Sequence, residues 1–164
     1  MKTLTLIRHA KSSWEHLGLP DIDRPLNPRG QRDAPRMGQR LKQAGVSFEA
    51  IIASPATRAL ETARMIAAQT GFPEEAIVID RDIYAAPVGR LLTLAQRLDD
   101  ALERIALVGH NPGFGQLASR LSPAFRYHLP TCGVVRLETD ADSWRQVQPG
   151  SMRLIDFDYP KRAD

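Results

Sequence analysis

Two histidines stand where the sequence predicts that a strand ends. His9 and its neighbour Arg8 follow the alternating, β-branched run Thr3–Ile7, and His110 comes just after the buried run Ile105–Val108. A neutral imidazole can attack phosphorus, and a neighbouring cation can hold the phosphoryl oxygens. Either histidine alone is more often a structural residue. Together, at the ends of separate strands, they indicate a site for phosphoryl chemistry.

A third predicted strand leads to another cation. The apolar run Phe48–Ala53 is followed by Ser54 and Pro55, which are typical of the cap and first residue of a helix, and then by Arg58. In the first turn of a helix the dipole disfavours a cation unless an anion binds there. We therefore expect Arg58 to join Arg8 around a phosphate. The alternative is a surface arginine that turns back to solvent.

A metal centre is the other chemistry that a histidine pair could support. Carboxylates from Glu15, Asp21 or Asp23 would have to complete it. Arg8 and Arg58 would repel a divalent cation at that place, and the chain has no HExxH, CxxC or other pattern with metal-ligand spacing. It also lacks a Walker loop and a GxGxxG motif. We expect neither a metal nor an organic cofactor.

The elements that must position these residues alternate between strand and helix. The predicted helices cover 28–43, 55–70, 89–104 and 114–121, and the predicted strands cover 3–7, 48–53, 76–79, 105–108, 133–138 and 153–157. Pro35 predicts a kink or a second start within the first helix. The alternation indicates an α/β fold, a three-layer α/β/α sandwich with a mostly parallel mixed sheet. Its strand ends would gather the candidate residues in one crevice.

The composition narrows the function class. Of 164 residues, 43% are hydrophobic and 25% charged, which predicts a single domain over residues 1–164. The net charge is +3, and the arginines are scattered along the chain. An anionic substrate explains this charge at least as well as nucleic acid does. We therefore expect no nucleic-acid partner. No apolar run is long enough to span a bilayer, and the one cysteine fits a reducing compartment. We expect a cytoplasmic protein without membrane contact, and favour a monomer.

Four motifs carry a resemblance to a known family. The stretches "LIRHAKSSW", "RPLNPRG", "ASPATRALETA" and "LVGHNPG" resemble, in order and spacing, the histidine phosphatase superfamily, which has the phosphoglycerate mutase-like fold. They cover about two thirds of the chain. The short length and the "RHAKS" start are most similar to the small bacterial phosphohistidine phosphatases of the SixA type.

The resemblance implies a role for each matching position. His9 corresponds to the nucleophile that becomes phosphorylated, and the rest of the phosphate pocket corresponds to Arg8, Arg58 and His110. Two further substrate-binding positions are implied. Arg24 begins the element that shapes the entrance, and the Ser12 hydroxyl can contact phosphate.

The general acid is missing from this pattern. Mutase-like relatives place a glutamate shortly before an aromatic residue, but Arg81 falls near that place in this chain. An alkoxide leaving group needs a proton, whereas an imidazole, with a pKa near 6.5, leaves with little help. The gap therefore favours a phosphohistidine substrate. The alternative is that Asp21, Asp23 or Asp82 swings in as the acid for a phosphomonoester.

Three functions are open at this point. The first is hydrolysis of phosphohistidine on a protein through an intermediate at His9. The second is hydrolysis of a small phosphorylated metabolite by the same nucleophile. The third is a non-catalytic phosphate-binding or nucleic-acid-binding module, which would need arginines but not both His9 and His110. A mutase is the least expected, because the chain lacks room for the insertions that bind a sugar acid.

Overall fold

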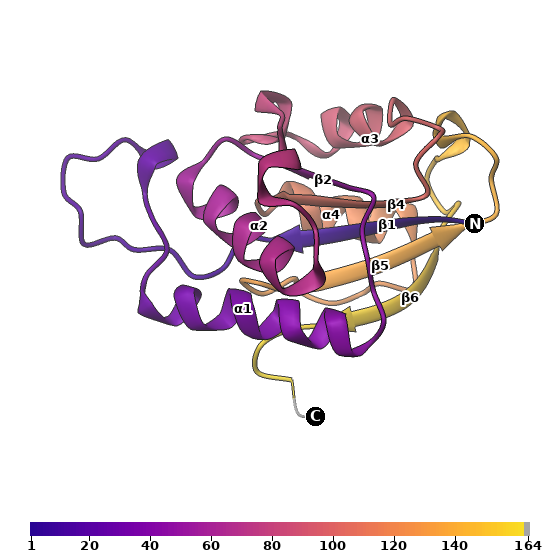
Figure 1. Cartoon of the computed structure of the whole chain (residues 1–164). Coiled ribbons are helices and arrows are strands. Elements are labelled where there is room, and N and C mark those ends of the chain that lie inside the picture. Colours follow the sequence, from indigo (N-terminus) through magenta and orange to yellow (C-terminus); the bar gives the residue numbers. More distant parts are fainter. Residues whose placement is uncertain (163–164) are drawn as a thin grey trace.

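A six-stranded β-sheet with helices on both faces forms the centre of the molecule (Figure 1). This computed structural model describes residues 1–162. The strand order is β3-β2-β4-β1-β5-β6. The strands are β1 (Lys2–Arg8), β2 (Ala50–Ala53), β3 (Val78–Ile79), β4 (Arg104–Gly109), β5 (Val134–Thr139) and β6 (Arg153–Asp158). The first four are mutually parallel, and β5 runs antiparallel to both of its neighbours, β1 and β6.

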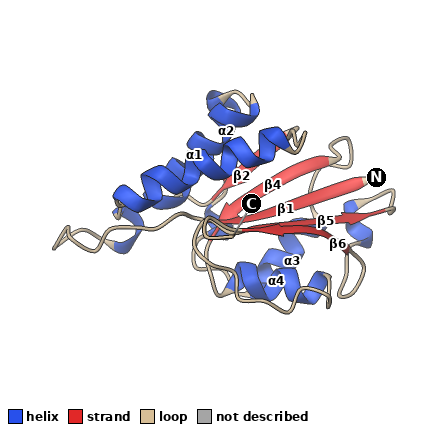
Figure 2. Cartoon of the chain, turned by 90° about the horizontal axis from the view of Figure 1, so that it is seen from below, coloured by secondary structure: helices blue, strands red, loops and turns tan. Residues whose placement is uncertain are grey.

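The helices form the two outer layers, so the predicted three-layer α/β fold with a mostly parallel mixed sheet is confirmed (Figure 2). On one face lie α1 (Pro28–Gln43) and α2 (Thr57–Thr70), and on the other lie α3 (Val88–Gln96) and α4 (Gly113–Leu121). Four short 3-10 turns complete the elements: Asp21–Asp23, Glu74–Ala76, Arg81–Ile83 and Trp144–Gln146.

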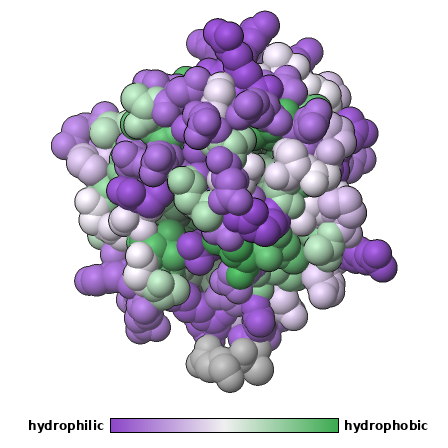
Figure 3. All heavy atoms as spheres, turned by 90° about the vertical axis from the view of Figure 1, so that its right-hand side faces the viewer, coloured by the Kyte–Doolittle hydropathy of each residue, from purple (hydrophilic) through white to green (hydrophobic). Residues whose placement is uncertain are grey.

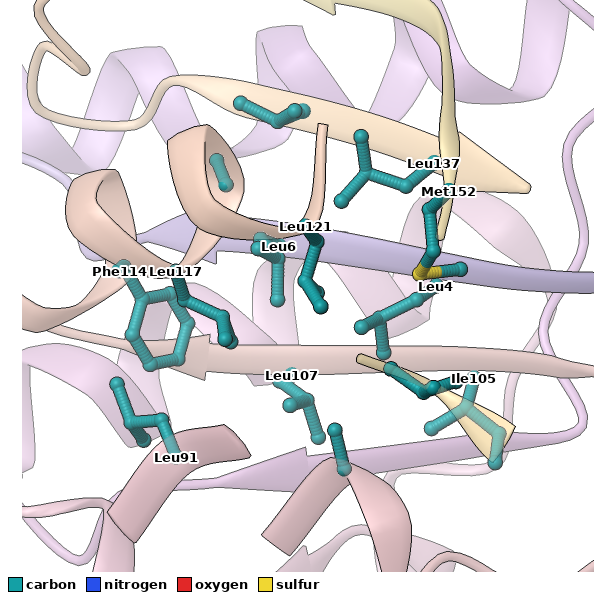
Figure 4. Packing of buried hydrophobic residues seen from close by; sticks show 14 of the residues in the cluster. Leu4, Leu6, Leu91, Ile105, Leu107, Phe114, Leu117, Leu121, Leu137 and Met152 are labelled. Carbon is teal, nitrogen blue, oxygen red and sulfur yellow. The ribbon is translucent and has the colours of Figure 1, made fainter. Parts of the chain in front are cut away.

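Alternation along the central strand divides the core between the two faces. Leu4 and Leu6 of β1 pack toward α4, where the close view shows them with Leu117 and Leu121 (Figure 4). Ile7 belongs to the cluster beneath α1 and α2 instead. This is the period of two expected for a strand that is buried on both faces.

The register of β1 and β4 brings the two histidines to the same edge of the sheet. Ile7 pairs with Val108 and Arg8 with Gly109, so His9 and His110 each follow the last residue of neighbouring parallel strands. The His9 backbone N–H donates to the Gly109 carbonyl oxygen (2.9 Å). At the opposite edge, where the parallel strands begin, hydrophilic and hydrophobic residues are interspersed (Figure 3).

The first helix has the predicted bounds, 28–43, and is not divided at Pro35. The Asn27 side chain accepts the Gly30 N–H (2.9 Å), and Pro28 occupies the first helical position. The helix passes through Pro35 as one element, so the expectation of a second start is wrong. Packing of its apolar face against α2 and the sheet outweighs the loss of one backbone hydrogen bond.

Two other helix boundaries differ from the prediction. The helix expected from Pro55 begins at Thr57, and no side chain caps it. The helix expected to reach Arg104 ends at Gln96. There, Asp99 accepts the Ala101 N–H (2.9 Å) and turns the chain toward β4.

The C-terminal segment closes the sheet by pairing β6 with β5, as the sequence indicated. Trp144 is fully buried in the core, and its backbone N–H donates to the Asp100 carboxylate (2.8 Å). Arg40 of α1 binds the Asp158 carboxylate (3.2 Å) and the Tyr159 carbonyl oxygen (3.0 Å), which ties the end of β6 to the helix layer. Within residues 1–162, no helix is long and apolar enough to cross a membrane.

Candidate active site

The two predicted histidines meet at the carboxyl ends of β1 and β4. Their ring centroids are 5.2 Å apart and the rings are tilted by 56°. Both residues are buried, with 8% of His9 and 9% of His110 exposed. Two imidazoles held this close in a nearly dry site can act on a single ligand.

One hydrogen bond determines which nitrogen of His9 is available. His9 Nδ1 lies 2.7 Å from the Ala10 carbonyl oxygen. A carbonyl oxygen can only accept, so Nδ1 carries the ring hydrogen and Nε2 presents its lone pair. Burial lowers the pKa of His9 to about 3. The Ala10 hydrogen bond opposes this shift, while His110, Arg58 and Arg8 add to it by charge repulsion. At neutral pH the ring is therefore uncharged, with the Nε2 lone pair available for attack.

His110 is fixed by a residue whose role the sequence did not reveal. Its Nε2 lies 2.7 Å from the Ser54 hydroxyl oxygen, which also accepts the Ala56 N–H (3.2 Å). The hydroxyl hydrogen can point at Nε2, and in that arrangement the ring hydrogen of neutral His110 lies on Nδ1. That atom has no hydrogen-bond partner among the described residues. Burial, and then repulsion by Arg58, lowers the pKa of His110 to about 4.

Ser54 had been predicted as a helix cap, and that prediction is wrong. The helix starts three residues later, and the Ser54 backbone N–H donates to Val108 of β4 (3.0 Å). Because β2 and β4 are parallel neighbours, Ser54, which follows β2, lies beside His110, which follows β4. The position of Ser54 at a strand end was the available signal, and the helix-start pattern concealed it.

Arg58 lies in the first turn of α2 and is not a surface residue, since only 6% of it is exposed. Its Nη1 donates to the Asp21 carbonyl oxygen (2.7 Å), and its Nη2 donates to Asp21 Oδ2 (3.0 Å). Its charge lowers the pKa values of both His9 and His110, so the guanidinium faces the histidine pair. The structure thus places a cation where the sequence predicted one.

Asp21 connects several groups around this arginine. Besides Arg58, its carboxylate accepts the Tyr84 hydroxyl (2.6 Å) and Arg24 Nε (3.1 Å). These hydrogen bonds, from Tyr84 first and then from Arg58 and Arg24, hold the pKa of Asp21 far below its usual range. The carboxylate is ionised at any ordinary pH, so it has no proton to give. Tyr84 also packs edge-on to His110, with 5.6 Å between centroids.

Arg24 and Ser12, the two predicted substrate-binding residues, contact one another. Arg24 Nη1 donates to the Ser12 hydroxyl oxygen (3.0 Å) and to the Ser13 carbonyl oxygen (3.1 Å). Ser12 also forms an isolated antiparallel bridge with Leu26. The outer face of the Arg24 guanidinium lies over the Trp14 ring, 3.5 Å from its centroid. Arg24 therefore joins the two ends of the loop that follows His9, residues 12–24.

Arg8, at the end of β1, binds the segment that contains Leu129. Its Nη1 donates to the Leu129 carbonyl oxygen (3.0 Å), which also accepts from the Asn111 amide (2.8 Å). Its Nε has no partner among the described residues. Partial burial lowers the pKa of Arg8, so this half-buried cation has lost part of its contact with water. Such a cation gains strongly from a bound anion.

Thr62 joins the strand that carries His9 to the helix that carries Arg58. Its hydroxyl oxygen accepts the Ala10 N–H (3.0 Å), and its hydroxyl hydrogen is donated to the Arg58 carbonyl oxygen (2.8 Å). Thr62 is fully buried. The hydrogen bond from Ala10, the residue after His9, thereby ties the strand end to the helix that carries Arg58.

The remaining acids considered from the sequence lie in exposed positions. Asp23 and Asp82 are both exposed, as are Arg81 and Glu15. None of these four has a hydrogen bond to a pocket side chain among the described contacts. Within residues 1–162, no three histidine, cysteine, aspartate or glutamate side chains are grouped so as to hold a metal ion.

Similarity to known proteins agrees with this geometry. Residues 4–91 match the model of the histidine phosphatase superfamily, branch 1. An uncharacterised chloroplast protein of Arabidopsis thaliana is 34% identical over 165 residues, which span 93% of this chain and 75% of that protein. An uncharacterised protein of Mycobacterium tuberculosis strain H37Rv is 33% identical, spanning 94% of this chain and 100% of its own length.

Solved structures extend the similarity to the whole fold. A protein of Agrobacterium tumefaciens, provisionally assigned as the phosphohistidine phosphatase SixA, is 27% identical with a TM-score of 0.83, covering 97% of this chain and 98% of that one. The protein histidine phosphatase SixA complexed with tungstate is 20% identical with a TM-score of 0.82, covering 96% and 97% of the two chains. The latter similarity concerns the fold alone.

Proposed function

Because this chain belongs to the histidine phosphatase superfamily, branch 1, we propose that it hydrolyses phosphohistidine on a protein through a phosphohistidine intermediate at His9. One observation carries the choice of substrate. Asp21, the carboxyl group that contacts the pocket cation Arg58, is held ionised by three hydrogen-bond donors. A pocket without a proton to donate suits a leaving group that departs as neutral imidazole.

In the first step, His9 Nε2 attacks phosphorus as the bond from phosphorus to the substrate nitrogen breaks. The Nδ1–H of His9 remains hydrogen-bonded to the Ala10 carbonyl oxygen, and this bond stabilises the positive charge that develops on the ring. Arg8, Arg58 and His110 Nδ1 bind the phosphoryl oxygens, and they supply the charge stabilisation on which phosphoryl transfer mainly depends. The Ser12 hydroxyl and Arg24 border the entrance.

In the second step, water attacks phosphorus and the bond to His9 Nε2 breaks. The oxygen of water remains on phosphorus, one of its hydrogens stays on that oxygen, and the other passes to a phosphate oxygen or to solvent. His9 is thereby restored as a neutral ring. The low pKa of His9, about 3, makes it a weakly basic leaving group, which favours this release.

The leaving group distinguishes this function from ester hydrolysis. The second ring nitrogen of a phosphohistidine can be protonated near neutral pH, so the imidazole leaves without a proton from the enzyme. An alkoxide leaving group would need a proton from the enzyme. The similarity to the Agrobacterium protein, at 27% identity over almost the whole length, supports the same substrate class.

The test compares substrates and traps the intermediate. Wild-type protein is given phosphoramidate, a phosphohistidine peptide, p-nitrophenyl phosphate and several sugar phosphates, and kcat/KM is measured for each. We expect the two P–N substrates to be hydrolysed fastest, with acid-labile, alkali-stable phosphate on the chain after rapid quenching. Faster hydrolysis of a sugar phosphate would instead favour the small phosphomonoester. If no acid-labile phosphate forms on the chain, the intermediate is wrong.

A further inference from the structure

A groove along the outer side of α1 concentrates positive charge outside the histidine pocket. It has a volume of about 560 Å³ and lies between the first half of α1 and the segment that follows β6. Five cationic side chains and one carboxylate line it, together with Pro160: Arg29, Arg32, Arg36, Lys161, Arg162 and Asp33. Nothing in the proposed reaction at His9 uses these residues.

Ion pairs within the chain neutralise only part of this charge. Arg29 lies 3.5 Å from the Asp33 carboxylate, and Arg162 lies 3.7 Å from that of Asp156. Among the contacts of the described residues, Arg32, Arg36 and Lys161 form no ion pair, and all three are exposed. Like charges gathered without counter-charges repel one another, so an anionic ligand would relieve the repulsion.

The groove has a fixed wall on each side. Arg40 binds the Asp158 carboxylate and the carbonyl oxygens of Tyr159 (3.0 Å) and Pro160 (3.4 Å). These contacts hold the segment with Lys161 against α1, so the cations of the two walls belong to one surface. In Figure 1 this segment leaves β6 beneath α1.

The groove begins near the segment that carries His9. The Asn27 N–H, at the start of α1, donates to the Lys11 carbonyl oxygen (2.9 Å), and Gly30 packs against the Lys11 backbone. In addition, β6 is antiparallel to β5 and β5 to β1, so β6 ends at the same edge of the sheet as β1. One ligand can therefore bind at the histidines and in the groove at the same time, provided that it is larger than a metabolite.

We propose that this groove binds an acidic surface of the phosphorylated protein that the histidine pocket acts on. The inference rests on the proposed function and adds the charge of the partner. Complementary charge speeds and orients encounter between proteins. A single-stranded nucleic acid is a poorer fit, because none of the described residues that line the groove is aromatic and able to stack with bases.

The experiment uses two phosphohistidine peptides of about 12 residues, long enough to extend about 40 Å. One is rich in aspartate and glutamate, and the other carries asparagine and glutamine at the same positions. The test variant is Arg32→Gln/Arg36→Gln/Lys161→Gln. The matched control, Arg90→Gln/Arg97→Gln/Arg145→Gln, removes three exposed cations from other surfaces and changes the net charge equally.

We expect the test variant to raise KM for the acidic peptide by about tenfold, with kcat unchanged. KM for the neutral peptide and for phosphoramidate should stay within about twofold of wild type. The difference should vanish in about 1 M salt, where the screening length falls to about 3 Å. If the control variant raises KM as much as the test variant, overall charge is the cause and the groove is not a docking surface. An unchanged KM in the test variant overturns the proposal as well.

Two further measurements separate this inference from the proposed function. Binding of the unphosphorylated acidic peptide, followed by fluorescence anisotropy, should weaken in the test variant even if no phosphohistidine substrate is hydrolysed by wild type. That result would keep the groove and reject the reaction. Loss of binding to a labelled single-stranded RNA, without any change in peptide KM or affinity, would identify the groove as a nucleic-acid surface and overturn the proposal.

Discussion

The phosphate pocket and the loop that leaves it are neighbours in sequence and opposite in character. His9 and Ser12 are less than 10% exposed, whereas Trp14 is 72% exposed and Leu17 is 96% exposed. Most polar groups in the pocket have partners in buried hydrogen bonds, and the loop carries apolar side chains into solvent. Under the proposed function, the groups assigned to the phosphoryl unit are buried and hydrogen-bonded, whereas the groups that would meet the rest of the substrate are exposed. Substitutions in the pocket should therefore slow the hydrolysis of every substrate. Substitutions in the loop should slow the hydrolysis of large substrates only.

The largest contrast should come from two histidines seven residues apart. His9→Ala removes the proposed nucleophile, so turnover of every substrate should fall by about 10⁴-fold or more. His16→Ala, in the exposed loop, should leave phosphoramidate hydrolysis within about twofold. Steady-state kinetics and quenched phosphate trapping measure both. A His9→Ala protein that folds and keeps its activity would remove the basis of the mechanism.

Two arginines of α2 offer the next comparison. Arg58→Ala should lower kcat/KM by about 10² to 10³-fold for P–N and ester substrates alike, because a buried cation is lost from the phosphoryl oxygens. Arg64, which pairs with Glu74 at the surface (3.4 Å), serves as the control, and Arg64→Ala should have little effect. Equal losses in the two variants would show that helix stability, and not phosphate binding, is at work.

Acid should destabilise the fold through the pocket histidines. Their folded pKa values, about 3 and about 4, lie below the unfolded value of about 6.5, so the unfolded chain takes up protons first as pH falls below 6.5. Between pH 7 and pH 5 each should lower the free energy of unfolding by about 2 kcal/mol. Urea denaturation at both pH values measures this. The double variant His9→Gln/His110→Gln should lose most of this pH dependence, and retention of the full dependence would contradict the assignment.

Ser54 should have a moderate effect of its own. Ser54→Ala removes the hydroxyl that fixes the ring hydrogen of His110, and kcat should fall by about tenfold, as for the loss of one buried hydrogen bond. Ser13→Ala is the control, because Ser13 is equally buried, at the base of the loop that follows His9, and its hydroxyl accepts the Glu15 N–H (3.1 Å). Similar kcat values for the two variants would assign Ser54 a packing role.

The smallest effect on chemistry should come from the loop itself. Trp14→Ala removes a ring that stacks on Arg24 but not the Arg24 hydrogen bonds to Ser12 and Ser13. Hydrolysis of phosphoramidate should stay within about twofold, since an exposed cation–π contact is worth only about 0.5–1 kcal/mol. KM for a phosphorylated protein should rise more. An equal loss with both substrates would mean that the loop is part of the pocket.

The strand ends were predictable from the sequence, and the contacts made by the loop between β1 and α1 were not. The runs that became β1 and β4 are β-branched and apolar, so their pairing followed from the strand–helix alternation, and with it the meeting of His9 and His110. Asp21 could not be placed, because its contacts to Arg58 and Tyr84 join residues 37 and 63 positions away in the chain.

The hydroxyl of Thr62 has a mechanical consequence. Its bond to the Arg58 carbonyl oxygen lies within α2, whereas its bond from the Ala10 N–H crosses from the helix to the strand end. A fluctuation that parts strand from helix must therefore break a buried hydrogen bond. A large substrate that displaces the exposed loop around Trp14 and Leu17 would therefore leave the separation between His9 Nε2, the proposed nucleophile, and the Arg58 guanidinium largely unchanged.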